Sequence, residues 1–421
     1  MGIFSALFSG VNGINASGNV MSVIGDNIAN VNTVGYKSSR AQFEDIMAGS
    51  GVGLGSRIAA VTGQFSQGGF ESTSEVTDVS LDGKGFFQLK DPNDGSTYYT
   101  RAGQFNLDKD GYLINPDGYR VQGFTLDSTT GNITSNVDAI QISQVPVPPS
   151  QTEEVVMSIN LDSNESAPGA FATTNPTGTS NFSAGVTVYD SLGNDHLTTL
   201  YFRKSSTNTW AYYALVDGGE LTTPSPGVNV TAASGTLLFD TDGSLLSVTE
   251  IANDFDFLGA TQSQAITFNF GTSTDDGGTG LDGLTQFGSA STITNISQDG
   301  YASGSLKSIE IDSDGTVSGN YTNGTNQIIT QLVVAKFNNE IALRRVGSNN
   351  YISTLDSGAA VLGAPSSGGN GALVSSTLEQ SNVDLASELI RMVVIQRGFQ
   401  ANSRTITTIN DLLAQLVTLG Q

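Results

Sequence analysis

Apolar residues recur at intervals of seven at both ends of the 421-residue chain, whereas its interior follows a different pattern. The C-terminal positions are Leu378, Leu385, Met392, Phe399, Ile406 and Leu413. A stripe kept on one face of a helix for that distance is a packing surface, and the seven-residue period favours left-handed supercoiling with a second helix. The pattern therefore predicts a helix over residues 378–421 that pairs with another helix.

The N-terminal segment shows a weaker form of the same pattern. Its heptad positions are Leu7, Ile14, Met21 and Ile28, and its glycines are Gly10, Gly13, Gly18 and Gly25. Each glycine costs a helix about 1 kcal/mol relative to alanine, so residues 1–30 should form a poor helix in isolation. We therefore expect this helix to be broken near Gly18, or to become ordered only when it meets its partners.

Between these ends, short apolar runs alternate with turn residues. Within residues 75–145 the Asp-Gly pairs stand at 82–83, 94–95, 110–111 and 117–118. Such pairs supply the positive φ that tight hairpins need, so they predict antiparallel sheet. The fold class we predict is mostly β with terminal α-helices, in which nested antiparallel β domains are carried on a coiled coil of the paired N- and C-terminal helices.

The order of these elements suggests nested domains with both chain ends together, and Pro146, Pro148 and Pro149 mark a boundary. The predicted parts are a terminal helical domain (1–30 and 378–421), an extended connector (31–74 and 358–377), a middle β domain (75–145 and 297–357) and an inserted outer β domain (146–296). In this arrangement the insertion is looped out of the middle domain.

Charge and composition narrow the possible classes of function. The formal net charge is −23, from 40 acidic and 17 basic residues, which argues against nucleic acid binding because phosphate contacts need Lys and Arg. Cysteine is absent, which excludes disulfides and thiolate chemistry. No apolar run is long enough to predict a membrane span. The first basic residue is Lys37, so we expect export without a cleaved signal peptide.

Three short motifs could indicate a catalytic, calcium or phosphate site, and in each case the surrounding sequence argues against it. The only histidine, His196, lies with a serine and aspartates inside residues 190–196, where a Ser-His-Asp set would occupy a single turn. Aspartate-rich turns at 108–111 and 312–315 lack the glutamate of an EF-hand loop. The Gly-Lys-Gly at 83–85 precedes a strand rather than a helix whose N-terminus could bind phosphate. We therefore predict no catalytic residue, no cofactor and no metal site, and do not expect an enzyme.

Longer motifs at the two ends resemble one protein family. Residues 25–37 have the sequence GDNIANVNTVGYK, and residues 378–385 and 396–402 have the sequences LEQSNVDL and QRGFQAN. These stretches closely resemble the N- and C-terminal signatures of the bacterial flagellar rod and hook proteins. They are long and lie at the places where that family carries them.

Interior motifs extend the resemblance. Segments similar to those shared across these axial proteins are QFSQG at 64–68, GKGFF at 83–87 and YTRAGQF at 99–105. Segments similar to the hook branch are VYDSLGN at 188–194, GYASG at 300–304, YTNG at 321–324 and AKFNN at 335–339. The chain length and these hook-like segments favour the hook branch over the shorter distal rod proteins.

The resemblance implies a structural subunit that self-assembles into the helical tube of the flagellar hook, a flexible coupling or universal joint that transmits motor torque to the filament. The terminal helices would line the channel, the middle β domain would form the wall, and the insertion would form the outer surface. The implied partners are other copies of the chain, the rod, the hook cap, the hook–filament junction proteins and the type III export apparatus, with no nucleic acid and no membrane insertion. The implied location is extracellular, in the hook and basal body.

The expected assembly interface combines both heptad columns with two asparagines of the N-terminal signature. Its residues are Leu7, Ile14, Met21, Ile28, Asn27, Asn30, Leu385, Met392, Phe399, Ile406 and Leu413. Two alternatives remain at this point: a distal rod subunit, which would form a straight and stiff tube, and a secreted β-rich binding or adhesion module with a helical oligomerisation stalk. Electron microscopy distinguishes them, because a hook subunit should form curved tubes and a stalked adhesin discrete oligomers.

Overall fold

The computed structural model describes residues 2–47, 53–127, 131–143 and 145–419. Its contacts divide the chain into two compact units. Unit 1 consists of Met1–Gln144, Ser308–Asn320 and Asn326–Gln421, and unit 2 consists of Val145–Lys307 and Tyr321–Thr325. The predicted fold class is confirmed: the chain is mostly β, and its first and last elements are helices that contact each other.

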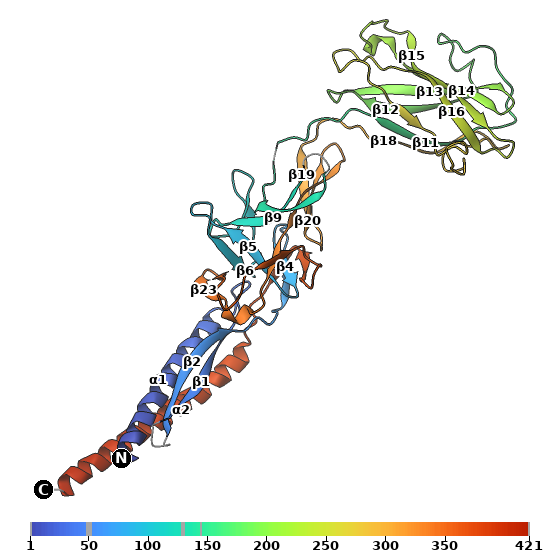
Figure 1. Ribbon diagram of the computed structural model, residues 1–421. Helices are drawn as coiled ribbons and strands as arrows, with labels where there is room; N and C mark the ends of the chain where they lie inside the picture. The colour runs from blue at the N-terminus through green and yellow to red at the C-terminus, as the bar shows by residue number, and fades with distance from the viewer. Residues whose placement is uncertain (1, 48–52, 128–130, 144, 420–421) are drawn as a thin grey trace. The chain divides into compact units, whose positions relative to one another are not determined.

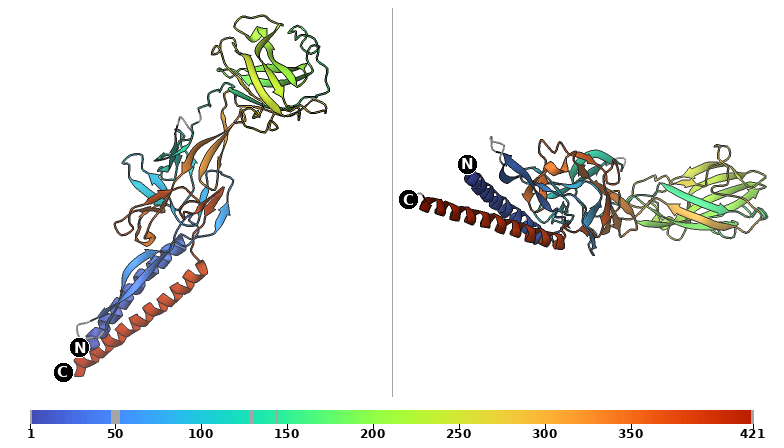
Figure 2. Two further views of the ribbon diagram at one scale, coloured as in Figure 1. Left: turned by 45° about the vertical axis from the view of Figure 1, so that its right-hand side comes forward. Right: turned by 90° about the horizontal axis from the view of Figure 1, so that it is seen from below.

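Helix α1 (Gly2–Ala29) runs without interruption, so the expected break near Gly18 is wrong. It lies antiparallel to α2 (Leu385–Leu419), with both chain ends at the same end of the pair (Figures 1 and 2). Gly10 lies at a close approach of the two helices, since a Cβ there would be only 2.9 Å from Cγ1 of Ile406. Packing against α2 and the neighbouring strands thus stabilises a helix that its own residues favour poorly.

Helix α2 begins later than the heptad pattern predicted. Asp384 is its N-cap: the carboxylate accepts hydrogen bonds from the amide of Ala386 (2.9 Å) and from the hydroxyl of Ser387 (2.9 Å). The Ser387 hydroxyl and the exposed amides hold the pKa of Asp384 below its usual value. Leu378, predicted to be the first helical seam residue, instead lies in strand β27 (Thr377–Glu379), where its side chain is buried. Pairing with strand β3 (Phe70–Ser72) therefore takes precedence over the heptad spacing at this position.

The predicted connector over 31–74 contains a β-hairpin of β1 (Ser39–Met47) and β2 (Gly53–Gly63). The hairpin lies along α1 (Figures 1 and 2). Asn12 of α1 donates a hydrogen bond from Nδ2 to the carbonyl of Leu54 at 2.9 Å. Gly55 has a φ of +92°, and a Cβ on it would be 3.0 Å from the Cα of Ser9. The glycines that suggested a connector therefore permit close packing of the hairpin on the helix.

The β part of unit 1 is built around a 13-stranded sheet whose main order is β19-β20-β21-β9-β5-β6-β24-β23. These strands are β19 (Leu306–Ile311), β20 (Thr316–Tyr321), β21 (Asn326–Leu332), β9 (Arg120–Leu126), β5 (Phe86–Lys90), β6 (Thr97–Thr100), β24 (Asn350–Ile352) and β23 (Arg344–Gly347). Attached to it are β7 (Asn106–Leu107), β8 (Leu113–Ile114), β10 (Ile133–Ala139), β22 (Val334–Lys336) and β25 (Val361–Gly363). The 3-10 turn η2 (Glu340–Ala342) precedes β23.

A second connector, predicted over 358–377, also contributes strands. Strand β25 pairs with β22, and β26 (Ala372–Ser375) pairs with β4 (Val79–Asp82). The aromatic core of unit 1 is formed by Phe86, Tyr99, Phe337 and Tyr351, with Phe65 packed on it. The edge-to-face contact of Phe86 with Phe65 (5.5 Å between ring centroids) brings the segment after the hairpin onto the sheet.

Unit 2 is a sandwich of two sheets around one core. The five-stranded sheet runs in chain order through β12 (Phe182–Tyr189), β13 (Asp195–Ser206), β14 (Thr209–Asp217), β15 (Asn229–Phe239) and β16 (Leu245–Asn253). The three-stranded sheet has the order β17 (Thr267–Asn269), β11 (Glu154–Asn160) and β18 (Thr292–Gln298), and η1 (Gly218–Glu220) follows β14. Strands β11 and β17 are parallel, which is a local departure from the antiparallel pairing predicted for the β domains. The chain can form this pair because a long excursion through the other sheet separates the two strands.

Candidate assembly surface

One face of α2 packs on α1 and carries most of the predicted heptad column. Its half-buried or buried positions include Met392, Ile395, Phe399, Asn402, Ile406, Ile409 and Leu413. The contact is direct at Gly10 and Gly13 of α1, where a Cβ would meet Ile406 and Asn402 respectively. The heptad column therefore serves first as the seam between the two helices of a single chain.

The predicted column of α1 lies at the edge of the buried stripe rather than at its centre. Leu7, Ile14, Met21 and Ile28 are all half-buried. The buried residues of α1 include Ala16, Val20, Ile24 and Asn27. Their spacing of four, four and three residues is that of one helix face, so a search at 3.6 rather than 3.5 residues per turn could have found them.

A second set of apolar side chains on the helices remains exposed in the single chain. On α1 these are Phe4, Phe8 and Val11, and on α2 they are Leu385, Leu389, Ile390, Val393, Val394 and Leu412. Of the predicted interface residues, Leu385 alone belongs to this set. Contiguous exposed apolar side chains of this kind mark surfaces that are covered in an assembly.

The two signature asparagines of the predicted interface make bonds within the chain. Asn27 is buried, and its carboxamide both donates to the Ser39 carbonyl and accepts from the Ser39 amide, at 2.9 and 2.8 Å. Asn30 donates to the carbonyl of Asp26 at 2.8 Å and accepts from the hydroxyl of Thr33 at 3.1 Å. Asn27 thus fixes the start of the hairpin to α1, while Asn30 stabilises the end of the helix.

Four of the motifs that carry the family resemblance meet in one place, which we call the four-motif junction. Its segments are residues 25–37, 64–68, 99–105 and 378–385. Backbone bonds from the Gly35 amide to the Glu379 carbonyl (2.7 Å) and from the Gln380 amide to the Gly69 carbonyl (2.8 Å) join the chain's two ends. A side chain on Gly35 would collide with the backbone of Ala102, which lies 2.4 Å from the position of its Cβ.

A buried ion cluster lies at the centre of this junction. Oε1 of Glu379 is 2.6 Å from Nζ of Lys37 and accepts a further hydrogen bond from the amide of Gly68 at 2.9 Å. Oε2 of Glu379 is 3.6 Å from Nη1 of Arg101, an ion pair beyond hydrogen-bond distance. All three charged side chains are almost fully buried. The cluster thus links the start of the chain, the first β segment and the approach to α2.

The electrostatics of the cluster follow from its burial. Burial lowers the pKa of Lys37, and the neighbouring carboxylate of Glu379 opposes this shift only in part. Arg101 has its pKa lowered by the same cause, and its Nη2 donates to the carbonyl of Gly83 at 2.8 Å. Sequence analysis missed this site. The signal available was that Lys37 is the first basic residue of the chain and ends a signature whose one other charged residue is Asp26.

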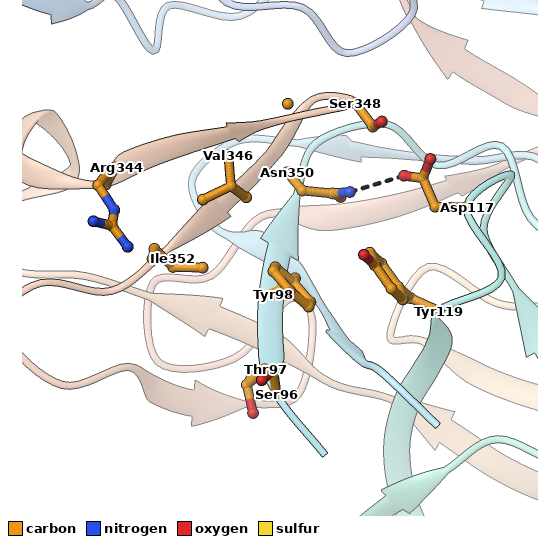
Figure 3. Close-up of a pocket in the computed structure, with 11 residues that line it drawn as sticks. Ser96, Thr97, Tyr98, Asp117, Tyr119, Arg344, Val346, Ser348, Asn350 and Ile352 are labelled. Carbon is orange, nitrogen blue, oxygen red and sulfur yellow. Dashed lines mark hydrogen bonds between the residues drawn. The ribbon is translucent and has the colours of Figure 1, made fainter. Parts of the chain in front are cut away.

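A polar hollow of about 430 Å³ lies on the sheet of unit 1 (Figure 3). The rings of Tyr98 and Tyr119 stack at 4.7 Å, and Nδ2 of Asn350 donates to Oδ2 of Asp117 at 2.9 Å. Arg344 lines the opposite side of the hollow. The residues lining the hollow provide stacking faces and hydrogen-bonding groups but no nucleophile paired with a base.

The histidine of unit 2 occupies a stacked and doubly hydrogen-bonded position. Its Nδ1 is 2.8 Å from Oε2 of Glu220 and its Nε2 is 3.3 Å from Oδ2 of Asp190, while its ring stacks on Phe257 at 3.8 Å. Ser191 instead accepts a bond from the amide of Thr261 at 2.8 Å. Burial acts to raise the pKa of Asp190, but bonds from Asn194, His196 and the Leu192 amide outweigh it and lower that pKa. Both ring nitrogens face carboxylates, so no Ser-His-Asp relay is assembled here.

The aspartate-rich turns are explained by their own backbones. Oδ1 of Asp108 accepts from the amides of Asp110 and Tyr112, both at 2.8 Å, in an Asx-type turn. Across the described ranges, no three His, Asp or Glu side chains gather closely enough to hold a metal ion. A search of the same part of the chain found no helix with the length and apolarity needed to cross a membrane.

Comparisons with known families match most of the chain. Residues 7–37 match the model described as flagella basal body rod protein, and 80–161 match the flagellar hook protein FlgE/F/G D1 domain. Residues 160–301 match the flagellar basal body protein FlaE D2 domain, and 374–419 match the flagellar basal body rod FlgEFG protein C-terminal region. These four matches follow the order of the chain from one terminal helix to the other.

Individual relatives match over almost the whole length. The chain is 38% identical to the flagellar hook protein FlgE of Salmonella typhimurium over 97% of this chain and 98% of the relative, and 36% identical to that of Escherichia coli over 98% and 100%. It is 34% identical to that of Treponema pallidum over 98% and 99%. The crystal structure of Helicobacter pylori flagellar hook protein FlgE2 is similar in fold, with a TM-score of 0.54 at 16% identity over 74% of this chain and all of that one.

Proposed function

This chain belongs to the flagellar hook protein FlgE family, and on that basis we propose which role each of its parts has in the hook. The chain is a structural subunit of the bacterial flagellar hook, which self-assembles into a helical tube and acts as a flexible coupling between motor and filament. The nearly full-length matches to hook proteins confirm the prediction of a hook subunit, rather than a distal rod subunit or an adhesion module. No catalytic step is part of the proposed role.

The helical pair is the proposed lining of the channel and the main site of contact between copies. Support comes from the apolar side chains of α1 and α2 that the single chain leaves exposed, because only a neighbouring copy in the tube would cover them. Burying one such side chain contributes about 1.5–3 kcal/mol. A few contacts per subunit are therefore enough to hold a polymer whose monomer stays soluble.

The middle β domain is the proposed wall of the tube, and residues 146–296 are the proposed outer surface. That segment has sixteen acidic and two basic residues, a formal charge of −14. Like-charged surfaces repel one another and remain hydrated, so outer domains of neighbouring copies can slide past each other as the hook bends. The four-motif junction would then carry force from the helices to the wall, since buried ion pairs and backbone bonds cross it.

The remaining partners follow from membership of the family. We propose that the subunit joins the rod at one end of the hook and the junction proteins at the other, and that it assembles beneath a hook cap. Export through the flagellar type III apparatus, without a cleaved signal peptide, would bring it to the extracellular end of the growing tube.

The substitution Phe399→Asp tests the assembly role of the helices. Phe399 is half-buried in the seam, so an aspartate there should separate α1 from α2 and abolish polymerisation, while the β domains stay folded. Gln400→Asp is the matched control, because it places the same charge at the adjacent exposed position. Electron microscopy should show curved tubes for the control alone. Normal tubes from Phe399→Asp would contradict the proposal.

A further inference from the structure

An apolar groove opens beside the start of α2. It has a volume of about 310 Å³ and lies between α1, α2 and strand β1. Its apolar lining includes Val20, Ile24, Phe43, Ile390 and Val394. Ile390 and Val394 are 67% and 61% exposed, although they line this hollow. The groove is therefore an uncovered part of the helical pair rather than a closed core.

One polar group in the groove is incompletely satisfied. Glu388 lines the hollow and is 95% buried, and its Oε1 accepts a hydrogen bond from Nη1 of Arg391 at 2.8 Å. Its Oε2 is buried and has no hydrogen-bond partner. A buried carboxylate oxygen without a hydrogen-bond donor destabilises the folded chain, because its desolvation is not compensated. The site is therefore suited to an occupant that brings both apolar surface and a hydrogen-bond donor.

The free end of the same helical pair, residues 2–15 of α1 and 405–419 of α2, has exposed apolar side chains and a hydrogen-bond donor. Phe4, Phe8 and Val11 lie on one face of α1 at spacings of four and three, and the two phenylalanines are 61% and 57% exposed. Asn15, exposed on the same face, carries an amide donor. No residue from 2 to 25 is charged. This segment can therefore enter an apolar groove without burying a charge.

Charges at the two sites are also complementary. Arg40 and Arg391 line the groove. Among residues 2–15 and 405–419, which make up the free end, the one charged side chain is that of Asp411, which is exposed. Arg391 is already paired with Glu388, so the attraction between Asp411 and Arg40 is the one that favours this pairing over a contact between two like ends.

The geometry prevents a chain from filling its own groove. Phe8 and Ile24 are sixteen residues apart on one helix, which at 1.5 Å per residue separates the two sites by about 24 Å. Because the groove is lined by residues 20–24 of α1 and by the first turns of α2, it lies at the opposite end of the antiparallel pair from the exposed phenylalanines near the start of α1. Two different patches at opposite ends make a heterologous contact, which repeats from copy to copy and builds an open helical filament wherever the rotation between copies does not close a ring.

We propose that the groove is the docking site for a second copy of this chain, whose α1 inserts Phe4, Phe8 and Val11 between α1 and α2 of its neighbour. Copies would then join head to tail along the helical pairs. The proposal rests on the role of the chain as a self-assembling hook subunit, and it specifies which segment of one copy meets which surface of the next.

Cysteine cross-linking in the assembled tube tests this contact on a background free of native cysteine. The variant Phe8→Cys/Ile390→Cys should give a ladder of covalent multimers when tubes are oxidised. The single variants can give at most dimers. Phe8→Cys/Gln400→Cys, whose second site is exposed on α2 outside the groove, should give no ladder. Tubes that form normally but show no ladder, or a cross-link within one chain, would overturn the docking while leaving the hook function intact.

A charge substitution provides the second measurement. Ile390→Asp changes a side chain that is exposed in the single chain, so the monomer should keep its circular dichroism spectrum and melting temperature. The critical concentration for tube growth should rise at least tenfold, whereas Gln400→Asp should leave it unchanged. Equal critical concentrations for the two variants would overturn the docking. Failure of the unmodified chain to polymerise would instead contradict the proposed function.

Discussion

Replacing Glu379 by alanine tests whether the four-motif junction holds the helices to the β-sheet. The carboxylate is fully buried and faces Lys37 at 2.6 Å and Arg101 at 3.6 Å. Without it, two buried cations lose their counter-ion in a region that water does not reach. Breaking a buried ion pair from one side costs about 3–5 kcal/mol, a large share of the roughly 5–15 kcal/mol by which a typical domain is stable.

The expected result is a lower melting temperature of unit 1. At about 2–4 °C per kcal/mol for a domain of this size, the loss is on the order of 6–20 °C. Calorimetry of the monomer supplies an internal reference, because unit 2 contains none of the three charged residues. Glu71→Ala is the matched control: Glu71 is exposed on β3, the strand paired with β27, and accepts one hydrogen bond from Gln380. Surface substitutions of this kind change stability by about 0.5 kcal/mol.

A double variant separates the loss of charge pairing from a general loss of packing. Lys37→Met/Glu379→Gln removes one buried cation together with the anion, and Arg101 keeps its bond to the carbonyl of Gly83. Replacing buried ion pairs by neutral groups is often close to neutral, so this variant should melt above Glu379→Ala. The reasoning is refuted if Glu379→Ala and Glu71→Ala melt at the same temperature.

Two further predictions concern the helix seam and a buried tyrosine. Gly10→Ala should destabilise the monomer by about 1–3 kcal/mol, because the added Cβ would meet Ile406. Gly18 has open space around it, so Gly18→Ala should stabilise α1 by up to about 1 kcal/mol. Urea unfolding measures both changes, and the opposite order of stabilities would contradict the close approach of the helices at Gly10. Burial raises the pKa of Tyr351 from 10.0 to about 12. The contribution of Tyr351 to the free energy of unfolding is therefore complete below pH 10 and is lost as the pH rises towards 12. Tyr351→Phe should flatten the alkaline fall in stability by up to about 1.4 kcal/mol per pKa unit, and an unchanged pH profile would contradict that assignment.

Local patterns in the sequence were enough to predict the class of fold. Heptad spacing predicted both terminal helices, and the Asp-Gly pairs predicted the β-rich interior, because each pattern depends on residues close together in the chain. The same patterns failed where a distant segment decides the outcome. Leu378 has the correct heptad spacing but lies in β27, because its backbone pairs with β3, about 300 residues earlier.

The candidate site was predicted only in part. The seam residues Met392, Phe399 and Ile406 do lie on the α2 face that packs towards α1, but the exposed apolar groups on the helices were not distinguished from the seam. A sequence pattern shows which residues are apolar, and only the packed helices show which of them remain uncovered. For that reason the groove beside Ile390 could not have been predicted.

The sequence by itself determined that the ends of the chain are helices, that the interior is β and that the motifs belong to the flagellar axial proteins. Periodicity, turn-forming residues and motif identity all depend on residues that are close together in the chain. Tertiary structure alone decided that Gly10 permits close helix packing, that residues 31–74 form a hairpin along α1, and that Lys37 meets Glu379 from 342 positions away. These features depend on distances between segments far apart in the chain, which no local pattern records.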